Sequence, residues 1–389
     1  MHATVTATDL VAPVAEEIRR TAPQAEAERR LPPPLMAALK GAGLFSIYTP
    51  RTFGGLELAL PEALAVVEEV SRHDGSTGWV VALGYANGYF TQALGPDAAA
   101  RLFERGAALI TAAPAFGVRA VAAEGGYRLT GRWSFNSGAP NADWVGAPAP
   151  VFEGDVPVTG PGGEPAVRFC FIPAADVRLI DTWHVTGLRA TGTHDLAVDD
   201  LFVPTERTGA FSPMGGPQSQ RPNALTLIPF FSLLGIVQAP PVLLGLARRF
   251  IEEFRGVLAT KEGGMGQPLR EQARGFESLA RSEALVRSAR CYWYDAVGEL
   301  WERVSRGGAP TLEDRTNARL ASLNVAEQCL AAAEALYRLA GTTPLFDTCP
   351  LERCWRDLRT TAQHFQVQPA RWETAGRALM GLDPGSPVL

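Results

Sequence analysis

Apolar residues recur at helical spacing through the first part of the chain, residues 8–110. Val11 and Val14, for example, are three positions apart, as expected on one face of a helix. Residues 77–89 are apolar on nearly every side, which predicts a helix buried in the middle of the protein. Asp74, just before this run, is a residue type that commonly caps a helix. The pattern therefore predicts an all-helical first domain, residues 1–107.

The helical period fades near Ala108 and does not return until after Phe211. Short apolar runs between glycine, proline and aspartate take its place, which is typical of strands joined by turns. Gly125-Gly126 is a predicted hairpin turn. These strands are expected at 109–111, 127–129, 166–172 and 196–203. We therefore predict a central β domain, residues 108–211, with a barrel or sandwich form.

Helical periodicity resumes at Leu225 and continues to the end of the chain. Residues 318–339 are rich in alanine and leucine, which suits long, closely packed antiparallel helices. Two further helices are expected at 351–367 and 370–379. Residues 212–389 are thus a predicted four-helix bundle domain. Because helices and strands occupy separate stretches, the fold class is α+β and not a doubly wound sheet.

Charge and cysteine content narrow the function classes. The formal net charge is −5, with 36 basic and 41 acidic residues, so the basic balance of a nucleic-acid binder is missing. The five cysteines are scattered and form no CxxC pair, which argues against a zinc site or a disulfide framework. The N-terminus has no signal-peptide pattern, and no apolar run reaches ~18 residues. We expect a cytoplasmic protein without a metal or a membrane span.

Residues 131–138, with the sequence GRWSFNSG, resemble a motif of the acyl-CoA dehydrogenases. In that family a β-domain segment passing the flavin ring has a glycine, three variable residues, an aromatic residue, one residue and a hydroxyl residue. Phe135 takes the aromatic position and Ser137 the hydroxyl position, which in the family lies by the flavin N5 and O4 edge. The segment 112–114 resembles the strand that meets the flavin pyrimidine, but it lacks the family's Thr-Glu pair.

The C-terminal segment 355–365, WRDLRTTAQHF, is similar to the family's Arg-Asp helix. In dehydrogenases that helix leads to a catalytic glutamate, and the corresponding position here is Phe365. A dehydrogenase needs a positioned base to remove an α-proton, and phenylalanine cannot serve. A minority of the family places its base on an earlier helix, in the region of Glu252 and Glu253, so that reading stays open.

The segment that replaces the glutamate, Arg-Asp-Leu-Arg at 356–359 followed by Gln-His at 363–364, resembles another branch of the family. That branch comprises the oxygenase components of two-component flavin-dependent monooxygenases. These include hydroxylases of the 4-hydroxyphenylacetate type and dibenzothiophene monooxygenases. Residues 74–79 and 187–193 also resemble that branch. The resemblance implies that a separate flavin reductase supplies reduced FMN or FAD. O2 then adds to give the C4a-hydroperoxyflavin, which hydroxylates an aromatic or polycyclic small-molecule substrate. A homotetramer is the family expectation.

The resemblance also implies site residues. Ser137 is the candidate hydrogen-bond donor beside flavin N5, and His364, whose ordinary pKa lies near neutrality, is the candidate to steady the peroxide or move a substrate proton. Without the resemblance, Ser137 would be interpreted as a turn serine bonded to its own backbone, and His364 as a residue that caps or packs at a helix end. The full candidate set is, for catalysis, His364 and Ser137; for flavin, Ala112, Ala113, Phe135, Asn136, Ser137 and His364; for substrate, Tyr85, Asn87 and Phe365.

Other readings remain open at this point. They are an acyl-CoA dehydrogenase with a relocated base, an N-oxygenase acting on an amino sugar, and a non-catalytic binding or scaffold subunit. Trp79 is expected in the core, and His73 is expected in solvent. Arg356 and Asp357 point in different directions on a helix and are expected to have structural roles.

Overall fold

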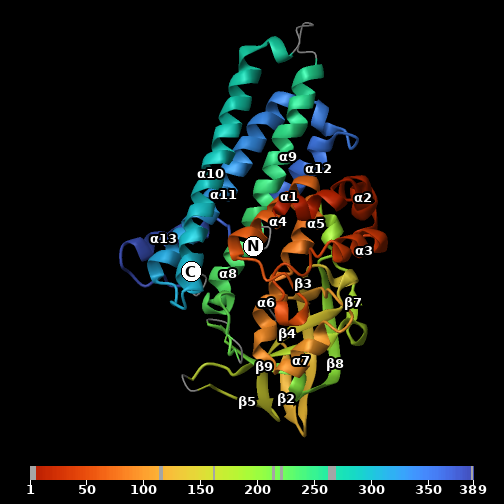
Figure 1. Ribbon diagram of the computed structural model, residues 1–389, viewed down its shortest axis with the longest axis vertical. Helices are drawn as coiled ribbons and strands as arrows, with labels where there is room; N and C mark the ends of the chain where they lie inside the picture. Colours follow the sequence, from red (N-terminus) through yellow and green to blue (C-terminus); the bar gives the residue numbers. More distant parts are fainter. Residues whose placement is uncertain are drawn as a thin grey trace.

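The computed structural model describes residues 6–113, 117–160, 163–212, 215–219, 222–261, 269–386 and 389. The chain has three successive parts: helices, then strands, then long helices (Figure 1). The strands lie at one end of the long axis and the long helices at the other; the helices of residues 7–82 lie between them, and those of residues 85–102 lie beside the strands. This is the predicted α+β order, with helix and strand segregated along the chain.

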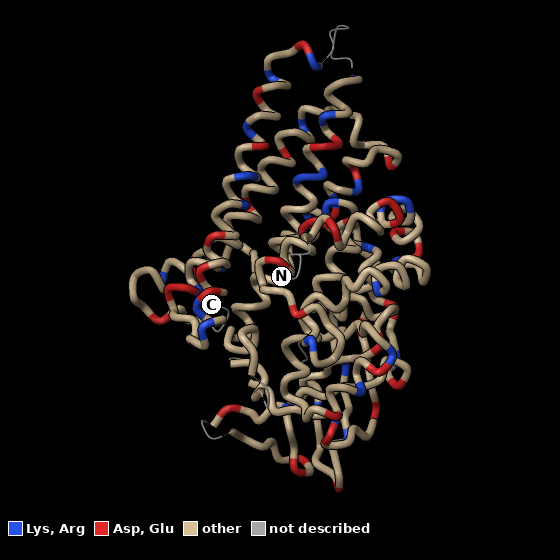
Figure 2. Tube along the Cα trace, viewed as in Figure 1, with Lys and Arg blue, Asp and Glu red and all other residues tan. Residues whose placement is uncertain are grey.

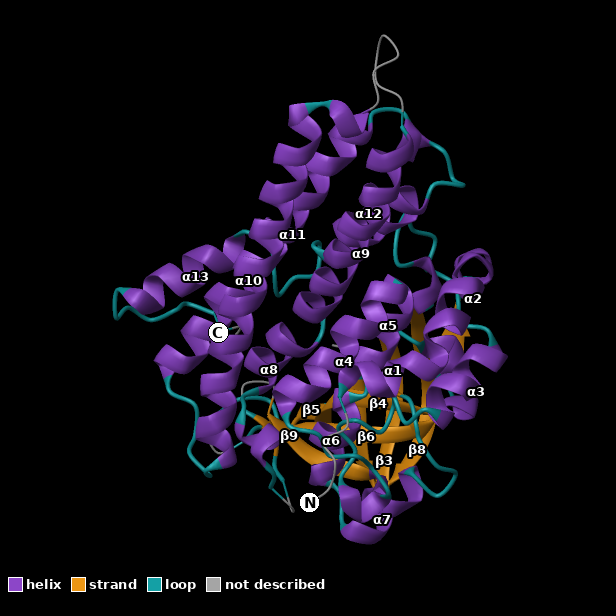
Figure 3. Cartoon of the chain, turned by 45° about the horizontal axis from the view of Figure 1, so that its top comes forward, coloured by secondary structure: helices purple, strands orange, loops and turns teal. Residues whose placement is uncertain are grey.

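The N-terminal helices pack over the sheet and against the bundle, as the turned view in Figure 3 shows. Asp74 caps α5 as predicted, because its carboxylate accepts a hydrogen bond from the Thr77 amide at 2.8 Å. The helices are α1 (Ala7–Val11), α2 (Ala15–Glu28), α3 (Pro33–Gly41), α4 (Leu60–His73), α5 (Gly75–Ala82), α6 (Tyr85–Tyr89) and α7 (Pro96–Leu102).

The predicted helix at 77–89 is in fact two helices, because α5 ends at Ala82 and α6 begins at Tyr85. Leu83 and Gly84 make i→i−3 hydrogen bonds to Val80 and Val81, so the chain tightens and changes direction there. Glycine is a poor helix former, which favours the break at this position. Both helices are buried, as the sequence predicted.

The strands follow one path, β10-β9-β6-β4-β2-β3-β8-β7, with β1 and β5 also paired to β4. The predicted hairpin at Gly125-Gly126 joins β2 to β3, where Ala123 faces Gly126. The strands are β1 (Ile110–Ala112), β2 (Arg119–Ala123), β3 (Gly126–Asn136), β4 (Trp144–Glu153), β5 (Val156–Pro157), β6 (Val167–Pro173), β7 (Arg178–Ile180), β8 (His194–Pro204), β9 (Thr208–Ser212) and β10 (Gly216–Pro217).

The sheet curls around a core of its own. Trp133 of β3, Ala147 of β4, Cys170 of β6 and Leu196 of β8 belong to one buried cluster, so side chains from four strands meet in one core. The central domain is a mixed sheet whose strand order runs from β10 to β7. The other face of the sheet contributes to the large core shared with the helices, through residues such as Phe169.

The C-terminal helices make the bundle. Its members are α8 (Phe230–Val237), α9 (Ala239–Thr260), α10 (Ala273–Ser305), α11 (Leu312–Ala340), α12 (Pro350–Thr361) and α13 (Ala370–Leu379). The stretch Phe230–Thr260 is long and apolar enough to cross a membrane, but 94% of its most apolar window is buried inside the molecule. That burial is typical of the core helix of a globular protein. Both basic and acidic residues occur along these helices (Figure 2).

The helix predicted at 351–367 ends at Thr361, so the chain leaves α12 before it reaches His364 and Phe365. From there the backbone makes successive i→i−3 turns, at Gln363, His364 and Val367. Two arginines hold the turned carbonyls: Arg371 donates to Phe365 O at 3.0 Å, and Arg319 donates to Gln366 O at 2.8 Å. Helical periodicity could not reveal these partners, because they come from α11 and α13.

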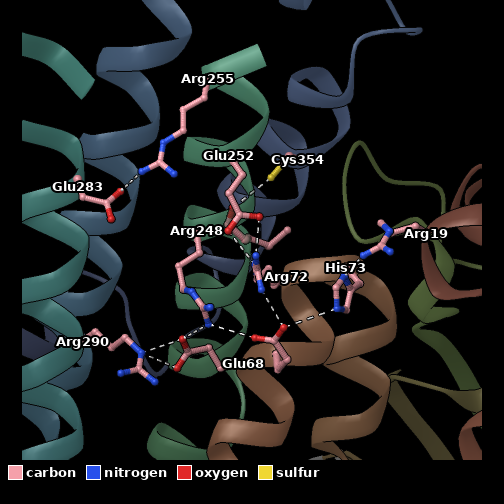
Figure 4. Close-up of polar contacts among 12 residues, drawn as sticks. Arg19, Glu68, Arg72, His73, Arg248, Glu252, Arg255, Glu283, Arg290 and Cys354 are labelled. Atoms are coloured by element: carbon pink, nitrogen blue, oxygen red, sulfur yellow. Dashed lines mark hydrogen bonds and ion pairs between the residues drawn. The ribbon is translucent and has the colours of Figure 1, made fainter. Parts of the chain in front are cut away.

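A buried carboxylate ties the N-terminal domain to the bundle (Figure 4). Glu68 of α4 is 1% exposed and accepts hydrogen bonds from Arg248 of α9 at 2.7 Å and Arg290 of α10 at 2.8 Å. The Tyr294 hydroxyl donates to its second oxygen at 2.8 Å. One carboxylate therefore fixes three helices from two domains.

The expectation that His73 is solvated is wrong. Its ring is buried at the end of α4, with Nδ1 2.6 Å from an Arg19 nitrogen, and Glu69 lies on the other side (Figure 4). Burial, followed by the charge of Arg19, lowers the pKa of His73 to about 4. Sequence position next to a turn suggested exposure, but α2 and α9 cover this turn.

Candidate active site

Ser137 lies just after a break in the β3–β8 ladder. The register shifts between Trp133 and Asn136, and Phe135 adopts a left-handed conformation with φ 63°. Such backbone strain in a non-glycine residue persists only where the surroundings enforce it, and it clusters at functional sites. The irregularity turns Phe135 outward, where 69% of its surface is exposed beside the Trp183 ring, and turns Ser137 inward.

The Ser137 hydroxyl has two partners in the interior. It accepts a hydrogen bond from Trp79 Nε1 at 2.9 Å, and it lies 2.9 Å from Thr193 Oγ1. Thr193 in turn lies 2.6 Å from Thr191 Oγ1. Trp79 comes from α5, whereas the threonines precede β8. Three segments distant in sequence therefore meet at one hydroxyl group.

His364 joins this group through Trp79. The two rings meet edge to face, with centroids 5.4 Å apart. His364 Nδ1 is buried and has no hydrogen-bond partner among the described residues. Buried polar atoms are almost always paired, so this nitrogen points to a partner that a ligand supplies.

Electrostatics keep His364 neutral. Burial, and then the positive charge of Arg319, lower its pKa to about 3. The near-neutral pKa expected from residue type is therefore absent in the folded protein. A neutral imidazole donates one hydrogen bond and accepts another, so His364 can orient a polar group without carrying charge.

The strand β1 carries Ala112 and lies beside this group. Thr111 Oγ1 donates to the backbone carbonyl of Ser137 at 2.7 Å, which brings β1 next to the hydroxyl cluster. Ala112 is paired with Gly146 of β4, and Ala113 follows at the end of the strand. Position 114 of the same predicted segment lies outside the described residues. Ala112 is partly exposed and Ala113 is 5% exposed, and each carries only a methyl side chain.

Aromatic rings line the region between α6 and the 364–366 turn. Phe90 is central: its ring stacks on Phe169 at 4.0 Å and lies 6.1 Å from Tyr85 and 5.5 Å from Phe230. The series continues through Phe231, whose ring is 6.5 Å from that of Phe365. Tyr85 and Phe365, both predicted to face substrate, therefore lie along one series of neighbouring aromatic rings.

Two other predicted site residues have their amides engaged in the fold. Asn87 is fully buried and donates to the carbonyls of Phe45 and Ala108, each at 2.9 Å. Asn136 donates to Trp133 O at 2.7 Å. In both, the side-chain oxygen is buried without a partner among the described residues. Their visible contacts hold the backbone around the site.

The Arg-Asp pair on α12 fastens the bundle to the β domain. Asp357 accepts a hydrogen bond from the Leu188 amide at 2.6 Å, and Arg356 forms an ion pair with Glu26 of α2 at 2.6 Å. Burial, followed by the charge of Asp74, raises the pKa of Asp357 to about 7. These contacts agree with the structural role expected for the pair.

The carboxylates considered as relocated bases are engaged in ion pairs. Glu252 pairs with Arg72 at 2.8 Å, and Glu253 pairs with Arg249 at 3.4 Å. Figure 4 shows Glu252 in the ion-pair network between α4 and α9. Across the described parts of the chain, no group of three or more His, Cys, Asp and Glu residues could hold a metal ion.

Sequence reasoning missed three residues of this site. Trp79 was expected only to fill the core, but its indole N–H reaches Ser137. Thr191 and Thr193 stand in a Thr-Gly-Thr segment that resembles the oxygenase branch, yet nothing in that segment indicated that its hydroxyls would meet residue 137. The signal was the presence of two hydroxyl residues around a glycine; their partner depends on the β3–β8 pairing.

Comparisons with known proteins agree with this geometry. Residues 7–100 match the model of the acyl-CoA dehydrogenase N-terminal domain, and residues 236–369 match that of the acyl-CoA dehydrogenase C-terminal domain. The chain is 30% identical to an indole-3-acetate monooxygenase of Pseudomonas putida, over 92% of this chain and 89% of that protein. It is 29% identical to the oxygenase component of an FADH2-dependent resorcinol hydroxylase of Rhizobium sp. strain MTP-10005, over 96% and 94%.

Among solved structures, the 3-HSA hydroxylase from Rhodococcus sp. RHA1 superposes with a TM-score of 0.88 at 23% identity, covering 100% of both chains. This likeness establishes the fold alone, whereas the sequence relatives and the domain matches establish descent. The chain belongs to the acyl-CoA dehydrogenase superfamily, in the branch of flavin-dependent monooxygenase oxygenase components.

Proposed function

We propose that this protein is the oxygenase component of a two-component flavin-dependent monooxygenase that hydroxylates an aromatic small molecule. The observation that carries the proposal is the junction of Ser137, Trp79 and His364, with a phenylalanine where a dehydrogenase has its carboxylate base. The monooxygenases among its relatives span nearly the whole chain, which supports the same chemistry.

The residues present fit a flavin. Phe135, two positions before Ser137, is 69% exposed and meets the Trp183 ring edge to face, and Ala112 and Ala113 at the end of β1 carry only methyl side chains. His364 Nδ1 is buried and has no hydrogen-bond partner among the described residues. When bound, reduced flavin activates O2 and supplies one oxygen atom to the substrate, so the hard chemistry belongs to the cofactor. FMN and FAD both remain compatible with these residues.

The chain's own task is to exclude water and to hold polar groups in fixed directions. Ser137 orients the flavin edge nearest β3, and the neutral His364 holds the reacting oxygen or the substrate hydroxyl by a hydrogen bond. The aromatic series from Tyr85 to Phe365 supports an aromatic substrate, because stacked and edge-on rings stabilise one another. Tyr85 and Phe365 are the proposed substrate contacts.

The proposal includes partners and a location. A separate flavin reductase supplies the reduced flavin, as the description of the resorcinol hydroxylase relative as an oxygenase component supports. We propose a homotetramer in the cytoplasm, as expected for the family. An N-oxygenase acting on an amino sugar would use the same flavin site, but the aromatic lining favours aromatic substrates.

The test supplies the purified protein with FMN or FAD, a flavin reductase, NADH, O2 and a panel of phenols and indoles. We expect a hydroxylated product, with oxygen from O2, for at least one member of the panel. His364→Ala should still bind flavin, while the ratio of product to O2 consumed falls and hydrogen peroxide release rises. Unchanged coupling in His364→Ala would remove His364 from the mechanism.

A matched control is His184→Ala, because His184 is largely exposed, with a side chain 66% accessible, and lies in the β domain. Its coupling should equal that of the wild type. If flavin bound to the protein is instead reduced anaerobically by an acyl-CoA thioester, and no panel member is hydroxylated, the monooxygenase proposal is wrong.

A further inference from the structure

Three hydroxyl groups form a buried row that ends at Ser137. Thr191, Thr193 and Ser137 are 1%, 6% and 7% exposed, so solvent offers them little competition. Thr191 Oγ1 lies 2.8 Å from the Leu188 carbonyl oxygen, 2.6 Å from Thr193 Oγ1, and Thr193 Oγ1 is 2.9 Å from Ser137 Oγ. Each hydroxyl has one proton to donate, so the directions of these bonds can be counted.

The count starts at the carbonyl, which can only accept. Thr191 therefore donates its proton to Leu188 O and must accept from Thr193. Thr193, having donated to Thr191, must accept from Ser137. The proton of Ser137 is thus committed to Thr193.

Trp79 uses a second position on the same oxygen. An indole N–H can only donate, so one lone pair of Ser137 Oγ receives Trp79 Nε1 at 2.9 Å. A hydroxyl has one proton and two lone pairs, so Ser137 retains a single lone pair. The Ser137 hydroxyl can therefore only accept a further hydrogen bond, whereas the sequence predicted that it would donate one.

The backbone that carries the row is fixed. Leu188, in a left-handed conformation with φ 51°, is held at its amide by the Asp357 carboxylate. Gly192, between the two threonines, also has positive φ, and a Cβ there would lie 2.7 Å from Pro140 Cδ. The Gly138 amide donates to Thr191 O at 2.6 Å. Reversal of the row would therefore break the Thr191–Leu188 bond without moving the chain.

We propose that Thr191 and Thr193 are positioning residues that make Ser137 a hydrogen-bond acceptor towards flavin N5, so that the site favours reduced over oxidised flavin. The inference rests on the proposed function, which puts the flavin N5 edge at Ser137. Reduced flavin carries a proton on N5 and can donate to this lone pair. Oxidised flavin has only a lone pair on N5, and two facing acceptors repel each other. An oxygenase that receives its flavin already reduced gains from this preference.

The experiment measures dissociation constants of FMN and FAD, oxidised in air and reduced anaerobically, for wild type and variants. Thr193→Val removes the acceptor for the Ser137 proton, which becomes free to donate to oxidised N5. We expect the affinity for oxidised flavin to rise about tenfold relative to that for reduced flavin, the equivalent of one hydrogen bond. For a two-electron couple this lowers the potential of bound flavin by ~30 mV.

Further variants distinguish a change in hydrogen-bond direction from a general loss of structure. Thr191→Val leaves Thr193 free to donate to Ser137, so it should give the same relative gain although Thr191 does not touch Ser137. The double variant should equal either single one, and Thr193→Ser should restore the wild-type ratio. Loss of structure would weaken both redox forms and could not produce a gain.

Thr111→Val is the matched control, because that hydroxyl bonds the Ser137 carbonyl and not its side chain. It should change both affinities alike. If wild type binds both forms and Thr193→Val leaves their ratio unchanged, the inference is wrong while the proposed function stands. If wild type binds neither FMN nor FAD in either state, the proposed function itself fails. A variant that does not fold is replaced by Thr191→Val, which makes the same prediction.

Discussion

His364 should make the folded protein sensitive to acid. Its pKa is lowered from the ordinary 6.5 to about 3, first by burial and then by the charge of Arg319. In the unfolded chain the ring regains its ordinary pKa. Between pH 6.5 and 3 the unfolded state therefore binds a proton that the folded state refuses, and the free energy of unfolding falls as the pH falls.

The size of this effect follows from the shift. A fully buried group in this window costs at most ~1.4 kcal/mol per pH unit. His364 is partly exposed although its Nδ1 is buried, so solvent screening reduces the total loss of stability that the shift can cause. Between pH 6.5 and 5 we expect a loss of ~1–2 kcal/mol attributable to this one residue.

The assay compares urea unfolding of wild type and His364→Gln at several values between pH 5 and 7.5. Glutamine has a similar size and does not titrate, so the difference between the two curves isolates His364. Contributions from His73, whose pKa is also lowered, are present in both proteins and cancel. The wild type should lose stability relative to the variant as the pH falls.

The control variant is His184→Gln, because the side chain of His184 is 66% exposed. Parallel curves for wild type and His364→Gln would refute the assignment of a neutral, buried imidazole. If the wild type instead gained stability relative to His364→Gln as the pH fell, the folded protein would favour the charged imidazolium form of His364.

Three further substitutions test the contacts between domains. Glu68→Gln should cost ~3 kcal/mol in urea unfolding, because it removes the charge facing two arginines and a tyrosine; Glu283→Gln, whose partners are more exposed, should cost less than ~1 kcal/mol. Because the pKa of Asp357 is raised from 3.8 to about 7, its carboxyl group lowers the free energy of unfolding of the wild type by up to ~4 kcal/mol as the pH rises through this range. Asp357→Asn should remove this loss, so the variant should become more stable than the wild type as the pH rises. Gly187→Ala would set a Cβ 2.3 Å from Arg356 O, and calorimetry should show a loss of ~1–3 kcal/mol.

The sequence by itself determined the order of helices, strands and helices, because the period of apolar residues reports which side of each element is buried. It also determined the hairpin at Gly125-Gly126, the Asp74 cap and the helix at 370–379, all of which depend on neighbours in the chain. The sequence also showed that Phe365 replaces the catalytic base, because this position lies at a fixed spacing from the Arg-Asp motif.

Tertiary structure alone decided how the site residues meet and in what state. Ser137 finds Trp79 and Thr193 because β3 pairs with β8 beneath α5, and no local pattern encodes that pairing. The neutral state of His364 depends on burial by α5 and on the charge of Arg319 from α11. Residue types and local spacing come from the chain, whereas hydrogen-bond direction and pKa depend on groups that only the folded molecule brings together.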